Sequence, residues 1–141
     1  MDNKDYIYKI KRLKSVKYAD YDEESYRNAI DRIKELIKTG NLCCELEHPL
    51  VKSSILRISV IEPTRVCGKI IDIDDEYITV KLLGPLGEEV KHMLDLNENF
   101  YKAAMRMLCK KPLSPEGKKI ITNIITFDIV LADYKIDLKE K

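Results

Sequence analysis

The sequence lacks the features that mark several large classes of protein. No apolar run reaches about 18 residues, the length of a membrane-spanning helix, and the starting segment MDNKDYIYK has no apolar region of the kind found in secretion signals. We therefore expect neither secretion nor membrane insertion. Lys and Arg number 25 against 24 Asp and Glu, and the net charge of +1 gives no overall field that would attract nucleic acid or an anionic membrane.

The four cysteines also lack the spacing of a metal site. Cys43 and Cys44 are adjacent, Cys67 and Cys109 are isolated, and there is no Cys-x-x-Cys motif. Neighbouring cysteines do not readily provide two ligands of one tetrahedral site. We therefore expect four reduced, buried thiols, with no metal and no other cofactor.

The composition instead describes one globular domain that spans residues 1–141. Hydrophobic residues make up 45% of the chain and charged residues 35%, whereas glycine and proline number only five each, which excludes a fibrous or low-complexity protein. A chain of this length buries about two thirds of the surface that its unfolded form exposes. A single compact core is therefore expected.

The N-terminal segment, residues 1–17, is locally basic. Its lysines and arginine alternate with apolar residues, which is typical of a half-exposed strand. We interpret residues 5–14 as an edge strand, and the alternative is an arm that binds a polyanion or a partner protein. The basic residues are Lys4, Lys9, Lys11, Arg12, Lys14 and Lys17.

Two segments have the periodicity of amphipathic helices. Apolar residues recur on one stripe of residues 22–39, acidic residues occur at the start of the segment, and Gly40 follows its end. A helix over 22–39 is therefore predicted. The later segment GPLGEEVKHMLDL places its large apolar residues on one helical face and predicts a second, short helix.

Most of the remaining chain alternates with the period of two that is typical of strands. The predicted strands are LCCELE, SILRISVIEPTRV, GKIIDID, EYITVKLL, FYKAAMRMLCK and KKIITNIITFDIVLADYKI. Asp74, Asp75 and Glu76 are interpreted as a hairpin turn, and together with Asp72 they suit a solvated loop better than a calcium site. The predicted fold class is α+β, with an antiparallel, barrel-like sheet of about six to seven strands and two flanking helices.

Four segments, in the same order along the chain, resemble the motifs of one protein family. YRNAIDRIKELIKTGNLCCELEHP is similar to a helix, a turn and a Gly-Glu-Leu-x-His-Pro signature, and ILRISVIEPTRVCGKIIDID to an Asp-Arg-Val-Ser-His strand followed by a Gly-Lys strand. GPLGEEVKHML and TNIITFDIVLAD resemble a Thr-Pro-x-Gly-Lys segment and a closing Asp-Phe-x-x-x-x-Asp-Ile-Val segment. The family is that of the prohead maturation proteases of tailed bacteriophages, so the resemblance implies a fold like that of the herpesvirus assemblins.

The resemblance also implies a chemistry. Proteases of this family use a serine nucleophile and a histidine base, supported by a second polar group that is often another histidine, because a hydroxyl attacks a peptide only if an oriented imidazole removes its proton. His48, followed by Pro49, matches the first histidine. Val60 occupies the position expected for the second, and its isopropyl group cannot orient an imidazole.

The family's nucleophile is also missing from its expected position. That position corresponds best to Ala104 and Met105, or one place earlier to Ala103 and Ala104, and no serine occurs over residues 64–113. We therefore predict an inactive protease relative with no catalytic residue. The positions that remain as relics are His48, Val60, Ala104 and Met105.

The resemblance and these departures together predict a structural protein of a phage head. The expected role is that of an auxiliary or decoration protein, which binds and stabilises the shell of major capsid protein in the virion after assembly in the host cytoplasm. Further expected partners are other head proteins or copies of the chain itself, with no small-molecule substrate, no specific nucleic acid and no membrane. Two alternatives stay open: an active prohead maturation peptidase with a displaced nucleophile, and an internal scaffold or core component.

A displaced nucleophile could be a cysteine thiol with His48 as its base. Cys44 lies four residues before His48, and Cys109 lies beyond the expected nucleophile position. Cysteines in apolar strands are more often part of the core than reactive. We therefore favour the structural interpretation of both thiols.

Overall fold

The computed structural model describes residues 6–13, 21–49, 55–110 and 117–132. Residues 1–5 and 14–17 of the basic N-terminal segment lie outside these ranges. Within them the elements are β1 (Ile7–Lys11), α1 (Glu23–Thr39), β2 (Cys43–Glu45), α2 (Ile55–Ile58), the 3-10 turn η3 (Pro63–Arg65), β3 (Val66–Ile73), β4 (Tyr77–Leu82), α3 (Gly84–Leu96), β5 (Tyr101–Lys110) and β6 (Ile120–Leu131).

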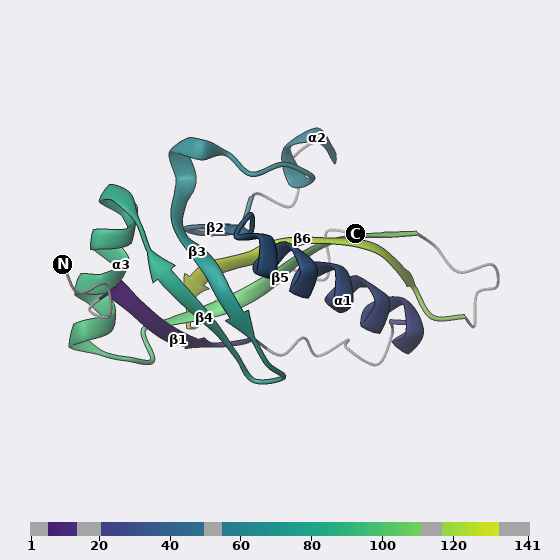
Figure 1. Ribbon diagram of the computed structural model, residues 1–141, viewed down its shortest axis with the longest axis horizontal. Coiled ribbons are helices and arrows are strands. Elements are labelled where there is room, and N and C mark those ends of the chain that lie inside the picture. The colour runs from purple at the N-terminus through teal and green to yellow at the C-terminus, as the bar shows by residue number, and fades with distance from the viewer. Residues whose placement is uncertain (1–5, 14–20, 50–54, 111–116, 133–141) are drawn as a thin grey trace.

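The described strands form two antiparallel sheets (Figure 1). One sheet has the order β1-β4-β3-β2, and β5 pairs with β6 in a long two-stranded ribbon. Single bridges at Arg12–Ala103 and Leu46–Ile129 link the ribbon to the two edges of the larger sheet. The predicted α+β fold with antiparallel strands is confirmed, but the predicted barrel is wrong, because isolated bridges do not continue the hydrogen-bonded ladder around a closed sheet.

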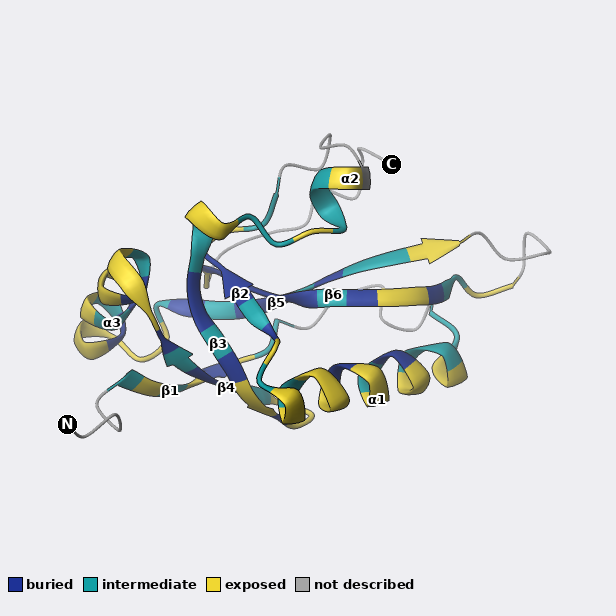
Figure 2. Cartoon of the chain, turned by 45° about the horizontal axis from the view of Figure 1, so that its top comes forward, coloured by how far each residue is buried: buried dark blue, intermediate teal, exposed yellow. Residues whose placement is uncertain are grey.

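The main apolar core contains side chains from both sheets. Ile78 and Val80 of β4 are fully buried and belong to the same cluster as Phe127 and Ile129 of β6. Their spacing of two residues places them on one face of each strand. Figure 2 shows α1 alongside the ribbon, with its buried positions toward β6 and its exposed positions on the outer side.

Helix α1 confirms the helix predicted over residues 22–39. The side chain of Asp22 accepts a hydrogen bond from the Ser25 amide at 2.9 Å and so caps the first turn. Gly40 follows the last turn with a φ of 76°, in the left-handed region that favours glycine, and its amide donates to the carbonyl of Ile37. The apolar stripe of the helix buries Ala29 and Ile33.

Helix α3 has the bounds of the predicted segment GPLGEEVKHMLDL. Val90 and Leu94 are buried on the face that packs against the core, and Leu86 and Met93 are partly buried beside them. The described helices include none that combines the length and the hydrophobicity needed to cross a membrane.

The strand predicted for SILRISVIEPTRV is wrong over most of its length. The described part of this segment forms α2 and η3, and strand structure begins only at Val66. The carbonyls of Ile58 and Val60 accept hydrogen bonds from the side chain of Arg106, and Arg57 reaches Glu45. The backbone of this segment therefore forms hydrogen bonds with charged side chains and not with a neighbouring strand.

The predicted edge strand is confirmed as β1, which lies at one edge of the four-stranded sheet. The acidic hairpin turn is confirmed as well. The carboxylate of Asp74 accepts hydrogen bonds from the amides of Glu76 and Tyr77 at 2.8 and 2.7 Å, which also lower the pKa of Asp74. Within the described ranges no three His, Cys, Asp or Glu side chains are grouped as metal ligands.

Candidate functional site

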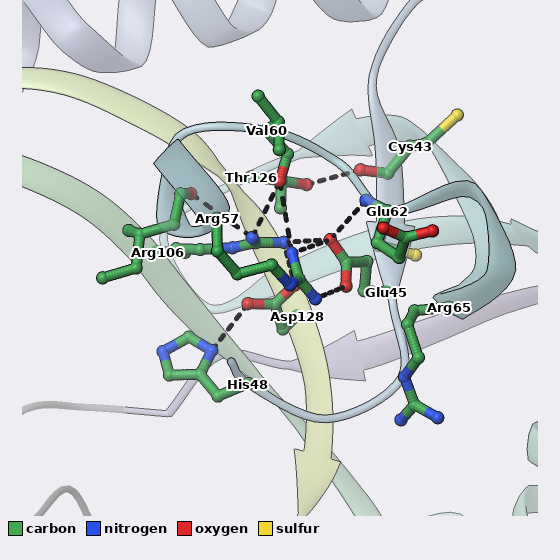
Figure 3. Close-up of polar contacts among 12 residues, drawn as sticks. Cys43, Glu45, His48, Arg57, Val60, Glu62, Arg65, Arg106, Thr126 and Asp128 are labelled. Carbon is green, nitrogen blue, oxygen red and sulfur yellow. Dashed lines mark hydrogen bonds and ion pairs between the residues drawn. The ribbon is translucent and has the colours of Figure 1, made fainter. Parts of the chain in front are cut away.

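His48 contacts a buried carboxylate where the chain leaves β2 (Figure 3). Its Nδ1 lies 2.6 Å from Oδ2 of Asp128 on β6. The imidazole is 15% exposed and the carboxylate is completely buried. A carboxylate at this distance holds the ring in one orientation and one tautomer, which is the role that a third group has beside a catalytic histidine.

An unusual bend at Glu47 directs His48 toward β6. Glu47 has a φ of 70°, in the left-handed region that residues with a Cβ rarely adopt. This conformation costs a non-glycine residue about 1–2 kcal/mol. The bend is held by a hydrogen bond of 2.7 Å from the Glu47 amide to the carbonyl of Ile129 and by the bridge between Leu46 and Ile129.

Arg106 of β5 joins Asp128 to a second buried carboxylate, that of Glu45. One guanidinium nitrogen, Nη2, lies 2.9 Å from Asp128 Oδ1 and 2.7 Å from Glu45 Oε2. The other, Nη1, donates to the carbonyls of Ile58 and Val60 at 3.3 and 3.1 Å. Arg106 is 3% exposed, and its Nε has no hydrogen-bond partner among the described residues. This one side chain therefore connects β2, β5, β6 and the segment that contains α2.

The surroundings of Glu45 favour its ionised form. Arg57 donates to Glu45 Oε1 at 2.6 Å and the amide of Glu62 donates to Oε2 at 3.0 Å. Burial alone would raise the pKa of Glu45, but the hydrogen bonds from Arg57, Arg106 and Glu62 outweigh it and hold the pKa below its ordinary value. The negative charges of Glu45 and Asp128 are therefore matched by the positive charges of Arg57 and Arg106.

Three of the four predicted relic positions lie at this network. His48 binds Asp128, and Val60 contributes its backbone carbonyl to Arg106. Ala104 pairs with Asp128 across the ladder of β5 and β6, so the two side chains lie on the same face of the ribbon. Met105 pairs with Phe127 and lies on the opposite face. Position 104 is therefore the one that faces the carboxylate.

The cysteines differ from one another in their surroundings. Cys44 and Cys67 are buried with their sulfurs 3.9 Å apart, and the hydrogen bond between them, together with burial, raises the pKa of Cys44 well above its ordinary value. Cys43 is half-buried and Cys109 is exposed, so the expectation of four buried thiols is wrong for these two. Cys109 lies five residues beyond Ala104 on β5, a distance of about 17 Å along an extended strand.

Sequence reasoning identified His48 but not the charged residues around it. Glu45, Arg106 and Asp128 each occur within an otherwise apolar strand, in CCEL, AAMRML and TFDIVL. A charge inside a buried strand must be paired, because an isolated one is very costly to remove from water. Charges of opposite sign in three buried strands were therefore the signal that could have predicted this network.

Comparisons with known proteins support the fold. No protein-family model matches the chain, and no curated protein matches it in sequence. Among solved structures, the chain is similar to the capsid assembly protease gp21 of bacteriophage T4, with a TM-score of 0.58 and 18% identity over 78% of this chain and 69% of that one. The fold is therefore like that of a phage prohead protease, as the resemblance in sequence implied.

Proposed function

We propose that this chain is a catalytically inactive relative of the prohead maturation proteases, which binds and stabilises the shell of major capsid protein as an auxiliary protein of the phage head. The likeness in fold to a capsid assembly protease supports a role at the capsid. The observation that carries the loss of activity is Ala104, a methyl group at the position of β5 that faces the carboxylate beside His48.

The chemistry of peptide hydrolysis explains why this position matters. An oxygen or sulfur atom must attack the peptide carbonyl and lose its proton to a base within hydrogen-bond reach. The side chain of Ala104 provides neither atom, and that of Val60 cannot polarise an imidazole. Asp128 still holds His48, so the proposed site keeps an oriented base while the family's position for the nucleophile carries a methyl group.

The proposed binding can be measured by co-sedimentation. The purified protein is mixed with shells assembled from the major capsid protein and centrifuged, and a parallel sample without shells serves as the control. We expect saturable recovery in the pellet at micromolar concentration. No association at such concentrations would reject the auxiliary role.

The second candidate is an active maturation peptidase with a displaced nucleophile. The contact of 2.6 Å between His48 and Asp128 favours it, because a carboxylate orients the imidazole of a general base in the same way. Incubation with capsid or scaffold precursors separates the two functions. We expect no cleavage, whereas cleavage by the wild type that is lost in His48→Ala would establish the peptidase.

The third candidate is an internal scaffold or core component that is present only during assembly. The two structural roles differ in the composition of the finished particle. The auxiliary role predicts that the chain is present in mature virions, assembled in the host cytoplasm. Mature particles can be examined on a protein gel. Absence of a band for this chain would favour the scaffold role.

A further inference from the structure

The outer face of the four-stranded sheet collects lysines from distant parts of the sequence. In the register of β1 and β4, Lys9 pairs with Thr79, Lys11 with Tyr77, and Ile7 with Lys81. These positions alternate with buried residues of both strands, so they lie on the side of the sheet away from the core. We call Lys9, Lys11, Lys81 and Lys102 the lysine face.

Lys102 joins this face where β1 meets the start of β5. The bridge between Arg12 and Ala103 places the residues that precede them, Lys11 and Lys102, beside each other. Lys9, Lys11 and Lys102 line a recess of about 370 Å³, together with Tyr77, Glu98, Asn99 and Tyr101. The recess thus has three ammonium groups and one carboxylate.

The four lysines of the lysine face form no ion pair with a carboxylate of the described residues. Two carboxylates lie nearby: the charge of Lys9 helps to lower the pKa of Asp74, and Asp72 pairs with Thr79 on the same side of the sheet. None of its four lysines takes part in the ion pairs or side-chain hydrogen bonds of the described residues. Glu98 lies in the recess without bonding to them, and Asp74, the nearby turn carboxylate, binds the backbone amides of its own hairpin.

Lys69 shows what a structural lysine on the same sheet does instead. It pairs with Lys81 across β3 and β4, but its ammonium extends to the end of α1, 3.2 Å from where a Cβ on Gly40 would lie. A positive charge there complements the negative end of the helix. No comparable partner accounts for the lysine face among the described residues.

We propose that the lysine face binds the phosphodiester backbone of nucleic acid without sequence preference. Ammonium groups and the hydroxyls of Thr and Tyr, which this face presents, are donors that proteins use to contact phosphate and sugar oxygens. Lysine is depleted at interfaces between proteins, where Trp, Tyr and Arg provide most of the affinity. Contacts to phosphate and sugar oxygens carry no sequence information, so no sequence preference is expected.

This inference does not depend on the proposed function. Binding of a polyanion was also the alternative interpretation of the basic N-terminal segment, where the sequence alone suggested it. The sequence showed only that Lys9 and Lys11 alternate with apolar residues. The fold adds Lys81 and Lys102, which lie at least 70 positions further along the chain. A net charge of +1 conceals this local concentration.

Fluorescence anisotropy with a labelled DNA duplex of arbitrary sequence tests the proposal. We expect micromolar binding at low salt, and log K should fall with log salt concentration with a slope of about −3.6 if all four lysines contact phosphates. The double variant Lys9→Gln/Lys11→Gln should bind about tenfold or more weakly and change the slope by about 1.8. The control variant Lys34→Gln/Lys110→Gln carries the same net charge and should bind within about twofold of the wild type.

Several results would overturn the proposal. These are the absence of binding at low salt, a slope near zero, or an equal loss of affinity in the test and control variants. Polyglutamate tests for an acidic polypeptide as the true partner. If it displaces DNA as effectively as unlabelled duplex at the same concentration of charge, the preference for phosphodiester is wrong. Thermal unfolding curves establish that each variant is folded.

Discussion

Arg106 is expected to have a large effect on stability. Its guanidinium lies between two completely buried carboxylates, those of Glu45 and Asp128, and also donates to two backbone carbonyls. Removing one partner of a buried charge network leaves the other charges without compensation. The network is thus much more sensitive to loss of one member than an exposed ion pair.

The substitution Arg106→Met should lower the free energy of unfolding by about 3–5 kcal/mol, because it leaves the buried Glu45 with the half-buried Arg57 alone and the buried Asp128 without a guanidinium partner. Arg27→Met is the matched control. It removes an exposed pair with Glu23 on α1 and should cost less than about 0.5 kcal/mol. Urea unfolding measures both, and similar small losses would contradict the assigned role of Arg106.

Glu45 should make stability depend on pH in the acid range. Its pKa is lower in the folded protein than its ordinary value of 4.5, so its stabilisation is complete above pH 4.5 and is lost as pH falls through the folded pKa. Urea unfolding between pH 6 and pH 3 should show a steeper loss in the wild type than in Glu45→Gln. If that variant does not fold, Arg57→Gln should reduce the dependence, and an unchanged slope would contradict this assignment.

The bend at Glu47 should favour glycine. Glu47→Gly removes the Cβ that makes the left-handed conformation costly, and it should raise the free energy of unfolding by about 1 kcal/mol. The carboxylate that is lost is 70% exposed and lies 3.6 Å from Arg65, a contact worth little. Glu47→Ala keeps the Cβ and should gain nothing. A glycine variant less stable than the alanine variant in thermal unfolding would contradict the strain.

At the scale of elements, α1 has the most complete set of local signals. An acidic first turn, an apolar stripe and a terminal glycine predicted its bounds closely, and the structure adds the Asp22 cap. Local rules were sufficient because the helix satisfies its ends with its own neighbours. Helix α3 also matches the bounds of its predicted segment, although Leu83 before it provides no side-chain cap.

The cap of α1 provides a test at this scale. Asp22→Ala removes the acceptor of the Ser25 amide and should lower the free energy of unfolding by about 1 kcal/mol, whereas Asp22→Ser should retain most of it. Circular dichroism during urea unfolding measures both variants. An equal loss in the two would mean that the side chain does not act as a cap.

Local rules failed for α2 because distant side chains determine its conformation. The alternating residues of ILRISV predicted a strand, but the carbonyls of Ile58 and Val60 bind Arg106, which is far away in sequence. No period within the segment carries that information. A correct prediction would have required knowing that Arg106 binds these carbonyls, and the sequence did not predict that Arg106 is buried.

At the scale of the whole molecule, the antiparallel α+β class could be predicted from periodicity, but the closure of the sheet could not. Closure depends on whether β1 and β2 continue the ladder to β5 and β6, and each instead contacts the ribbon through one bridge. The candidate site shows the same limit. His48 and the apolar residues at 60 and 104 were visible in sequence, whereas Asp128 and Arg106 became part of the site only through the pairing of β5 with β6.

We propose that the chain, with a fold like that of a capsid assembly protease, binds the capsid shell without cutting its subunits. The most direct measurement is the intact mass of precursor capsid subunits recovered from shells that have been pelleted together with the protein. The account predicts that the protein is present in the pellet and that the precursor mass is unchanged. Shortened subunits, or a pellet without the protein, would contradict it.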